Sequence, residues 1–178
     1  MLLLKILLIL CTQSSGMVCR TGKISFYSDA PLEKIEAHNR RVHITWDPQS
    51  GNAEFLVLMK AFEFKKALMQ EHFNDNYVES HLYPKAVFKG VLNTSPVDLQ
   101  TNQIIEVMAR GNLTLHGVTR SVALPGTIII QNGKVAMKAE FELTLSDFKI
   151  KIPAIVSRNI SKQVRVTVSA ADFNPVSS

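Results

Sequence analysis

The sequence predicts an all-β fold, an antiparallel barrel of about eight strands with one short helix. Apolar residues recur at every second position along most of the chain, which is typical of strands with one buried face. Turn signals separate these segments, and no regular alternation of strands with helices suggests a parallel sheet. Several strands are long, and closing the sheet into a barrel removes the edges that they would otherwise leave unpaired.

Length and composition fit one domain that folds alone. The chain has 178 residues, of which 46% are hydrophobic and 20% are charged, enough for a sizeable core. The formal net charge is +5, but Lys and Arg are scattered among Glu and Asp. Nucleic-acid binding calls for clustered basic residues with stacking aromatics. We therefore expect no nucleic-acid partner, and instead a mild attraction to anionic lipid surfaces.

The N-terminus reads as an export signal over residues 1–16. An apolar run ends at Cys11, the small Gly16 precedes Met17, and the run is too short for a membrane span. Cys11 and Cys19 both lack the small preceding residue of a lipoprotein signal, so lipid anchoring is the less favoured alternative. We expect a periplasmic protein of a bacterial envelope, with a mature domain that contains no disulfide and spans residues 20–174.

Eight segments have the composition and period of strands. They are 22–28, 40–46, 53–60, 85–92, 104–115, 118–130, 134–146 and 163–173. The Asn132-Gly133 pair predicts a tight hairpin between two of them. The stretch "SDAPLEKIEAHN" at 28–39 fits either a short helix or an irregular entry into a strand.

The apolar parity of the strands predicts the inward face of the barrel. A barrel of about eight strands has an interior just wide enough for side chains or for one slim ligand. Periodicity does not separate an ordinary core from a ligand cavity, so both remain open at this point. If a ligand binds inside, we expect it to contact Phe55, Val57, Phe88, Val107, Ala109, Met137, Ala139, Phe141 and Val166.

One helix is predicted at 62–73, "FEFKKALMQEHF", where apolar side chains recur three and four residues apart. An apolar stripe next to positive charge is suited to a lipid headgroup boundary. The segment up to Tyr83 is therefore a candidate gate for a lipid tail, and the alternative is a plug at the barrel end. The gate residues are Phe62, Lys65, Lys66, Met69 and Phe73.

Three stretches resemble motifs of the YceI-like family. They are "HFNDNYVESHLYPKAVFKG" at 72–90, "GNLTLHGVTRSVALP" at 111–125 and "SDFKI" at 146–150, and the resemblance runs from about Gly22 to Phe173. Lys149 stands where the family usually has Gly, and Ser121 where it often has Pro. The resemblance implies an exported, non-catalytic lipid carrier with a lipocalin-like barrel that holds an isoprenoid or similar tail. No cofactor is expected beyond that bound lipid.

Two other functions are weighed against the lipid carrier. A barrel filled by its own side chains would serve as a protein-interaction module, with 62–73 as its contact surface. A hydrolase would use Glu71, His72 and His81, although their spacing matches no strong metal-ligand motif. His116 and Gly117 are interpreted as the turn between two strands, with the ring satisfied by backbone. The sequence leaves the oligomeric state open.

Overall fold

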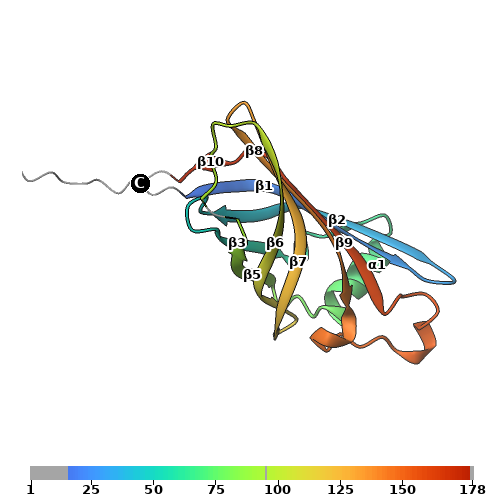
Figure 1. Ribbon diagram of the computed structural model, residues 1–178. Helices are drawn as coiled ribbons and strands as arrows, with labels where there is room; N and C mark the ends of the chain where they lie inside the picture. Colours follow the sequence, from blue (N-terminus) through green and yellow to red (C-terminus); the bar gives the residue numbers. More distant parts are fainter. Residues whose placement is uncertain (1–15, 95, 177–178) are drawn as a thin grey trace, which may run out of the picture.

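Figure 1 shows the computed structural model, which describes residues 16–94 and 96–176. In this part of the chain the strands form a closed antiparallel barrel, since β1 pairs with β2 on one side and with β9 on the other. The eight strands of the wall are β1 (Met17–Asp29), β2 (Lys34–Trp46), β3 (Asn52–Leu58), β5 (Lys85–Leu92), β6 (Gln103–Leu115), β7 (Val118–Gln131), β8 (Lys134–Thr144) and β9 (Gln163–Ala170). The predicted fold class is confirmed.

Several short elements are attached to the barrel wall. Strand β4 (Glu63–Phe64) adds to β2, and β10 (Asn174–Pro175) adds to the start of β1. The helical elements are α1 (Ala67–His72), the π-helical turn η2 (Phe73–Tyr77) and the 3₁₀ turns η1 (Met59–Ala61), η3 (Leu145–Phe148) and η4 (Ala154–Val156). Among the helices described, none is long and apolar enough to cross a bilayer.

The predicted helix at 62–73 is wrong in its extent. Phe64 pairs with Ala37 as part of β4, and its N–H donates to Oε1 of Gln70 at 3.2 Å, so α1 starts only at Ala67. The rings of Phe62 and Phe64 pack against Phe26, and this tertiary contact overrides the local helical period. The ambiguous 28–39 stretch contains the end of β1, a turn at 30–33 and the start of β2.

Two tight hairpins match their sequence signals. His116 and Gly117 have φ angles of +50° and +70°, and Asn132 and Gly133 have +51° and +72°. Two successive positive φ angles are the mark of the hairpin turn that suits the twist of the flanking strands. A Cβ on Gly117 would also come 2.5 Å from the ring of Tyr83. That position therefore requires glycine for both conformation and space.

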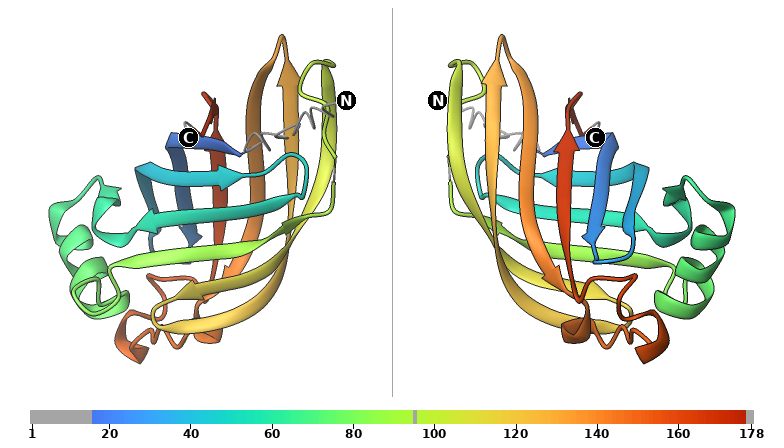
Figure 2. Two further views of the ribbon diagram at one scale, coloured as in Figure 1. Left: turned by 90° about the vertical axis from the view of Figure 1, so that its left-hand side faces the viewer. Right: turned by 90° about the vertical axis from the view of Figure 1, so that its right-hand side faces the viewer.

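The two ends of the barrel are built differently. Because successive strands run in opposite directions, the connections alternate between the ends. The turns 47–51 and 132–133 and the loop 93–102 lie at the end where β1 begins, called here the closed end. The longer connections 59–84 and 145–162 lie at the opposite end, called here the mouth. Figures 1 and 2 show α1 and the turns of 145–162 together at the mouth.

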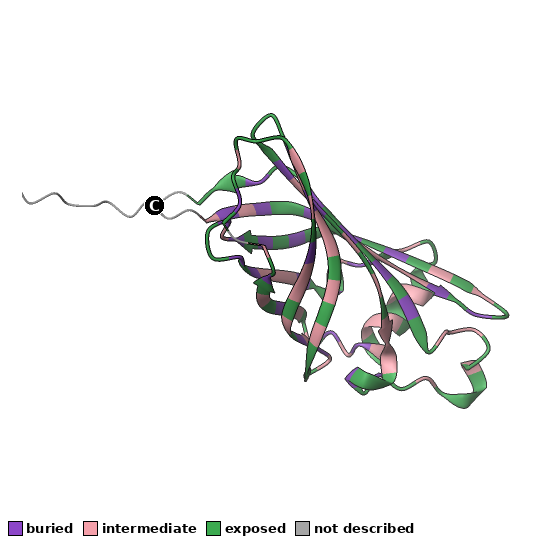
Figure 3. Cartoon of the chain, in the orientation of Figure 1, coloured by how far each residue is buried: buried purple, intermediate pink, exposed green. Residues whose placement is uncertain are grey.

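Large side chains fill the closed end. Cys19, Ile44, Trp46, Ile128 and Ile130 are all buried and belong to one hydrophobic core. Along the strands, buried positions alternate with exposed ones, as Figure 3 shows. The period of two seen in the sequence therefore corresponds to the inward and outward faces of a single wall.

Candidate functional site: an apolar cavity at the mouth

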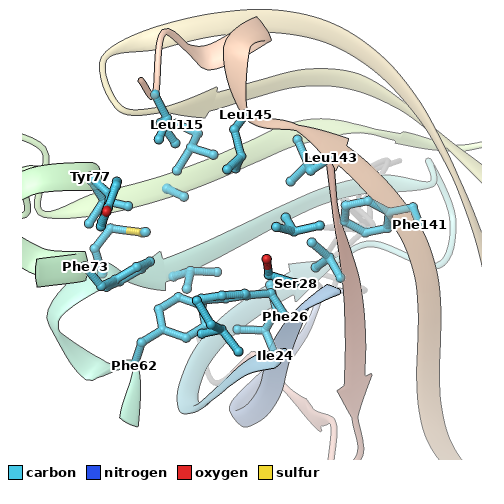
Figure 4. A pocket seen from close by; sticks show the side chains of 18 of the residues that line it. Ile24, Phe26, Ser28, Phe62, Phe73, Tyr77, Leu115, Phe141, Leu143 and Leu145 are labelled. Carbon is cyan, nitrogen blue, oxygen red and sulfur yellow. The ribbon is translucent and has the colours of Figure 1, made fainter. Parts of the chain in front are cut away.

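A cavity of about 410 Å³ lies inside the barrel toward the mouth. This volume is within the usual range for small-molecule sites, roughly 300 to 1,000 Å³. Aromatic and aliphatic side chains surround it from several strands, as Figure 4 shows for Phe26, Phe141 and Leu143. The interior at this end is thus not filled by the protein's own side chains.

Most of the residues expected to face a ligand line this cavity. They are Phe55, Val57, Phe88, Ala109, Ala139, Phe141 and Val166. That a ligand contacts them stays a prediction.

Val107 and Met137 belong to the same predicted set but lie elsewhere in the structure. Both are buried in the core, and neither lines the cavity. Met137 pairs with Ala170 at the end of β9, and Val107 pairs with Gly126, which places both toward the closed end. Parity identifies the inward face of a strand but carries no information on depth along the barrel axis.

Four phenylalanines form a cluster at one side of the cavity. Phe73 lies 5.6 Å from Phe26, 5.5 Å from Phe62 and 5.1 Å from Phe64, measured between ring centroids. Such ring pairs stabilise by about 0.5 to 1.5 kcal/mol beyond their burial. The cluster holds residues 62–83, called here the α1 segment, against β1. All four rings line the cavity. Phe26 and Phe64 are not among the residues expected from the sequence to contact a ligand, although the alternation of Ile24 and Phe26 indicates an inward-facing side.

The predicted gate residues divide into two groups. Phe62, Met69 and Phe73 line the cavity, whereas Lys65 and Lys66 are exposed outside it. Nζ of Lys66 lies 3.0 Å from Oε1 of Glu33, in the turn between β1 and β2. This ion pair joins two segments that border the mouth. Whether the segment opens for a ligand stays a prediction.

The connection 145–162 contributes a wall that the sequence did not reveal. Its lining residues are Leu145, Ile150, Val156, Asn159 and Ile160. They follow no single period, because the segment changes from 3₁₀ turn to irregular chain and back. The N–H of Ser161 donates to Oγ of Ser28 at 2.9 Å, and the N–H of Leu32 donates to the carbonyl of Arg158 at 2.9 Å. The connection is thereby bound to the β1–β2 hairpin.

A few polar side chains lie among the apolar ones. They are Ser28, Glu33, His72, Tyr77 and Asn159, and no Lys or Arg is among the described lining residues. Burial raises the pKa of the Tyr77 phenol above its ordinary value of 10.0. The polar groups are suited to hydrogen bonding with one end of an otherwise apolar molecule.

His116 connects three segments beside the mouth. Its Nδ1 lies 3.1 Å from the carbonyl oxygen of Phe148, and because a carbonyl only accepts, Nδ1 carries the donated proton. Its Nε2 lies 2.7 Å from Oε2 of Glu79, and its ring packs against Tyr83. The turn therefore has more than the backbone partner expected from the sequence. These contacts join η3 and the end of the 59–84 connection to the β6–β7 hairpin.

The residues of the alternative hydrolase are not assembled into a site. Glu71, His72 and His81 are all exposed, and in the described ranges no hydrogen bond or ion pair joins any two of them. The same ranges contain no group of three or more side chains suited to hold a metal ion. The cavity itself is lined mostly by side chains suited to an apolar molecule.

Known proteins match this chain in family and fold. A family model described as the YceI-like domain matches residues 20–171. A polyisoprenoid-binding domain from Saccharophagus degradans, implicated in plant cell wall breakdown, aligns with a TM-score of 0.73 at 13% identity, covering 90% of this chain and 98% of the other. BcnA of Burkholderia cenocepacia aligns with a TM-score of 0.69 at 16% identity, covering 85% and 96%. No curated protein matches the chain.

Proposed function

The chain belongs to the YceI-like domain family, and from this premise we propose that its barrel binds, sequesters or transports an isoprenoid or another long-chain amphiphilic lipid in the cell envelope, without catalysis. The observation that carries the proposal is the cavity of about 410 Å³, apolar along its walls and polar at a few points. The structural relative from S. degradans is a polyisoprenoid-binding domain, which supports the same ligand class.

Apolar burial alone is sufficient for affinity. Each buried methylene group contributes about 0.8 kcal/mol, so a five-carbon isoprene unit contributes roughly 3 to 4 kcal/mol. Association costs about 4 to 15 kcal/mol in lost freedom. A tail of a few isoprene units therefore offsets the cost without any charged contact, which agrees with a wall built from Phe, Val, Leu and Ala side chains.

Native mass spectrometry tests this proposal. Protein purified without detergent from its own envelope is expected to carry a mass that organic extraction removes and identifies as an amphiphilic lipid. A barrel recovered empty, with a co-purifying protein and no extractable lipid, would favour the alternative of a protein-interaction module.

The mouth is proposed to face a membrane surface during loading, with the α1 segment as the gate. Leu68 on α1 is 61% exposed and Ile155 on η4 is 91% exposed, so large apolar side chains of both mouth connections face solvent. Lys65 and Lys66 lie next to α1 and would attract anionic lipids, each by about 1 kcal/mol near the surface. An apolar tip flanked by positive charge is the arrangement of interfacial membrane contacts.

The gate is tested by Lys65→Glu, which leaves the Lys66 pair with Glu33 intact. We expect slower lipid loading from anionic vesicles, unchanged loading from neutral vesicles and unchanged equilibrium affinity. The reason is that surface charge changes the rate at which the protein meets the vesicle more than it changes the contacts of the bound lipid. Lys138→Glu, an exposed site on β8 with the same charge change, is the control. Equal loading rates of wild type and variant from both vesicle types would leave α1 as a structural plug.

Periplasmic location after removal of the export signal is part of the same proposal. The predicted signal lies almost wholly outside the described residues. Cys19, the other candidate for a lipid anchor, is fully buried in β1, where its Sγ donates to the carbonyl of Ala171 at 2.9 Å. An acylated N-terminal cysteine would have to leave this strand, which supports a chain without an anchor. N-terminal sequencing of protein from the envelope tests it, with a start near Met17 expected.

A further inference from the structure

We propose that the mouth selects amphiphiles with an uncharged or cationic head and rejects phosphate and diphosphate heads, and that the carboxylate of Glu33 is the selecting group. The inference rests on the proposed lipid-binding function and adds the chemistry of the head. Among the described lining residues Glu33 is the one acidic side chain, and none is Lys or Arg.

The position of Glu33 gives its charge a large effect on a bound head. Its side chain is 27% exposed, in the turn between β1 and β2 that borders the mouth. The neighbouring lining is apolar, and charges interact more strongly where water is partly excluded. A lipid whose tail fills the cavity leaves its head at the mouth, because burying a polar head among phenylalanines costs free energy. The head then lies close to this carboxylate.

Lys66 does not convert the mouth into an anion site. Its side chain is 68% exposed and contacts Oε1 of Glu33 from outside the cavity, since Lys66 is not a lining residue. Exposed ion pairs of this kind are weak. An anionic head that recruited Lys66 would take it from Glu33 and leave that carboxylate unpaired beside a second negative charge. A cationic head would instead share Glu33 with Lys66.

The other polar groups suit an uncharged head. Oγ of Ser28 already accepts the N–H of Ser161, so its hydroxyl hydrogen is available to donate. Figure 4 shows the hydroxyl oxygen of Ser28 directed into the cavity, toward the side where Leu143 and Leu145 lie. Tyr77 and Asn159 bring a phenol and an amide to the same lining. Hydroxyl, amide and amine heads can pair with these groups and with Glu33. A diphosphate needs several cations, and in place of Lys or Arg the described lining offers a single imidazole, that of His72.

Three probes with the same twenty-carbon tail and different heads show how the head alone affects affinity. They are geranylgeraniol, geranylgeranylamine and geranylgeranyl diphosphate. Affinities are measured at pH 7.5 on delipidated protein that has been refolded and checked by circular dichroism. We expect the alcohol and the amine to bind wild type at least tenfold more tightly than the diphosphate. Glu33→Gln should reduce that ratio several-fold, and Glu33→Lys should reverse it in favour of the diphosphate.

Glu36→Gln is the matched control, because Glu36 is exposed on β2, three residues after Glu33, and does not line the cavity. Its affinity ratios should equal those of wild type. Diphosphate binding as tight as alcohol binding in wild type, or an unchanged ratio in Glu33→Gln, would overturn the role of Glu33 while the lipid-binding function stands. Failure of every probe to bind wild type would contradict the lipid-binding function itself.

Discussion

The closed end and the mouth of this barrel use the same strands and the same alternation of side chains, yet one is a packed core and the other a cavity. At the closed end, Trp46 is 1% exposed and packs with Ile44 and Ile130 inside one cluster. At the mouth, Phe26 and Phe73 are only partly buried and border open space. From this difference we expect the closed end to contribute most to stability and the mouth to bind the ligand, which the following substitutions test.

The largest expected effect is loss of stability at the closed end. Trp46→Ala should lower the free energy of unfolding by about 3 to 5 kcal/mol, since it leaves a cavity among fully buried neighbours. Phe73→Ala at the mouth should cost roughly half as much, because its ring is partly exposed already. Denaturant unfolding of both variants measures the difference. Equal losses would show that the two ends are packed alike.

Filling the cavity should abolish binding and spare the fold. Ala139→Trp and Ala109→Trp place a large ring where both alanines line the cavity, and we expect at least a tenfold loss of lipid affinity. Ala123→Trp, at an exposed position of β7, is the control and should bind as wild type does. Lipid titration followed by tail fluorescence or native mass spectrometry measures this. Undiminished uptake by both cavity variants would place the ligand elsewhere.

A smaller effect is expected where the backbone at the mouth is strained. Lys149 has φ of +58°, in the left-handed region that L-residues adopt at a cost of roughly 1 to 2 kcal/mol. Glycine relieves this strain but also increases the conformational entropy of the unfolded chain, which opposes the gain. Lys149→Gly should therefore raise the free energy of unfolding by a net amount of up to about 1 kcal/mol. Lys151→Gly, which removes a lysine at a residue without a positive φ, should lower it slightly. Stabilisation of both variants alike would point to charge and not to backbone strain.

The smallest effect concerns pH. Burial raises the pKa of Tyr77, so the folded protein holds this proton more tightly than the unfolded chain does. The protonated Tyr77 contributes fully to the free energy of unfolding when the pH is below the ordinary phenol pKa of 10.0. This contribution is lost as the pH rises through the pKa of Tyr77 in the folded protein. Tyr77→Phe should flatten the fall in unfolding free energy as the pH rises above about 10, relative to wild type. An identical slope in both proteins would remove Tyr77 as the cause.

The sequence by itself determined the class of fold and the approximate positions of the eight wall strands, but neither the start of β2 at Lys34 nor the short strand β4. Period-two alternation reports which side of a strand faces inward, and Asn132-Gly133 and His116-Gly117 mark hairpins because few residues adopt two successive positive φ angles. Both signals are local and need no knowledge of neighbours. Lys149 also appeared in advance as unusual, standing at a position where the resembled family has glycine, and its backbone is left-handed in the structure.

Only the tertiary structure decided what each inward residue does. Ala109 and Ala139 line the cavity whereas Val107 and Met137 lie in the core, although all four share the inward parity of their strands. Depth along the barrel depends on strand tilt and on how the sheet closes, which parity does not encode. Likewise, Glu33 and Lys66 meet at the mouth only because the β1–β2 hairpin and the α1 segment reach the same end of the closed barrel. The set of charged and polar side chains at the mouth therefore exists only because the barrel closes and brings together residues that are far apart in the chain.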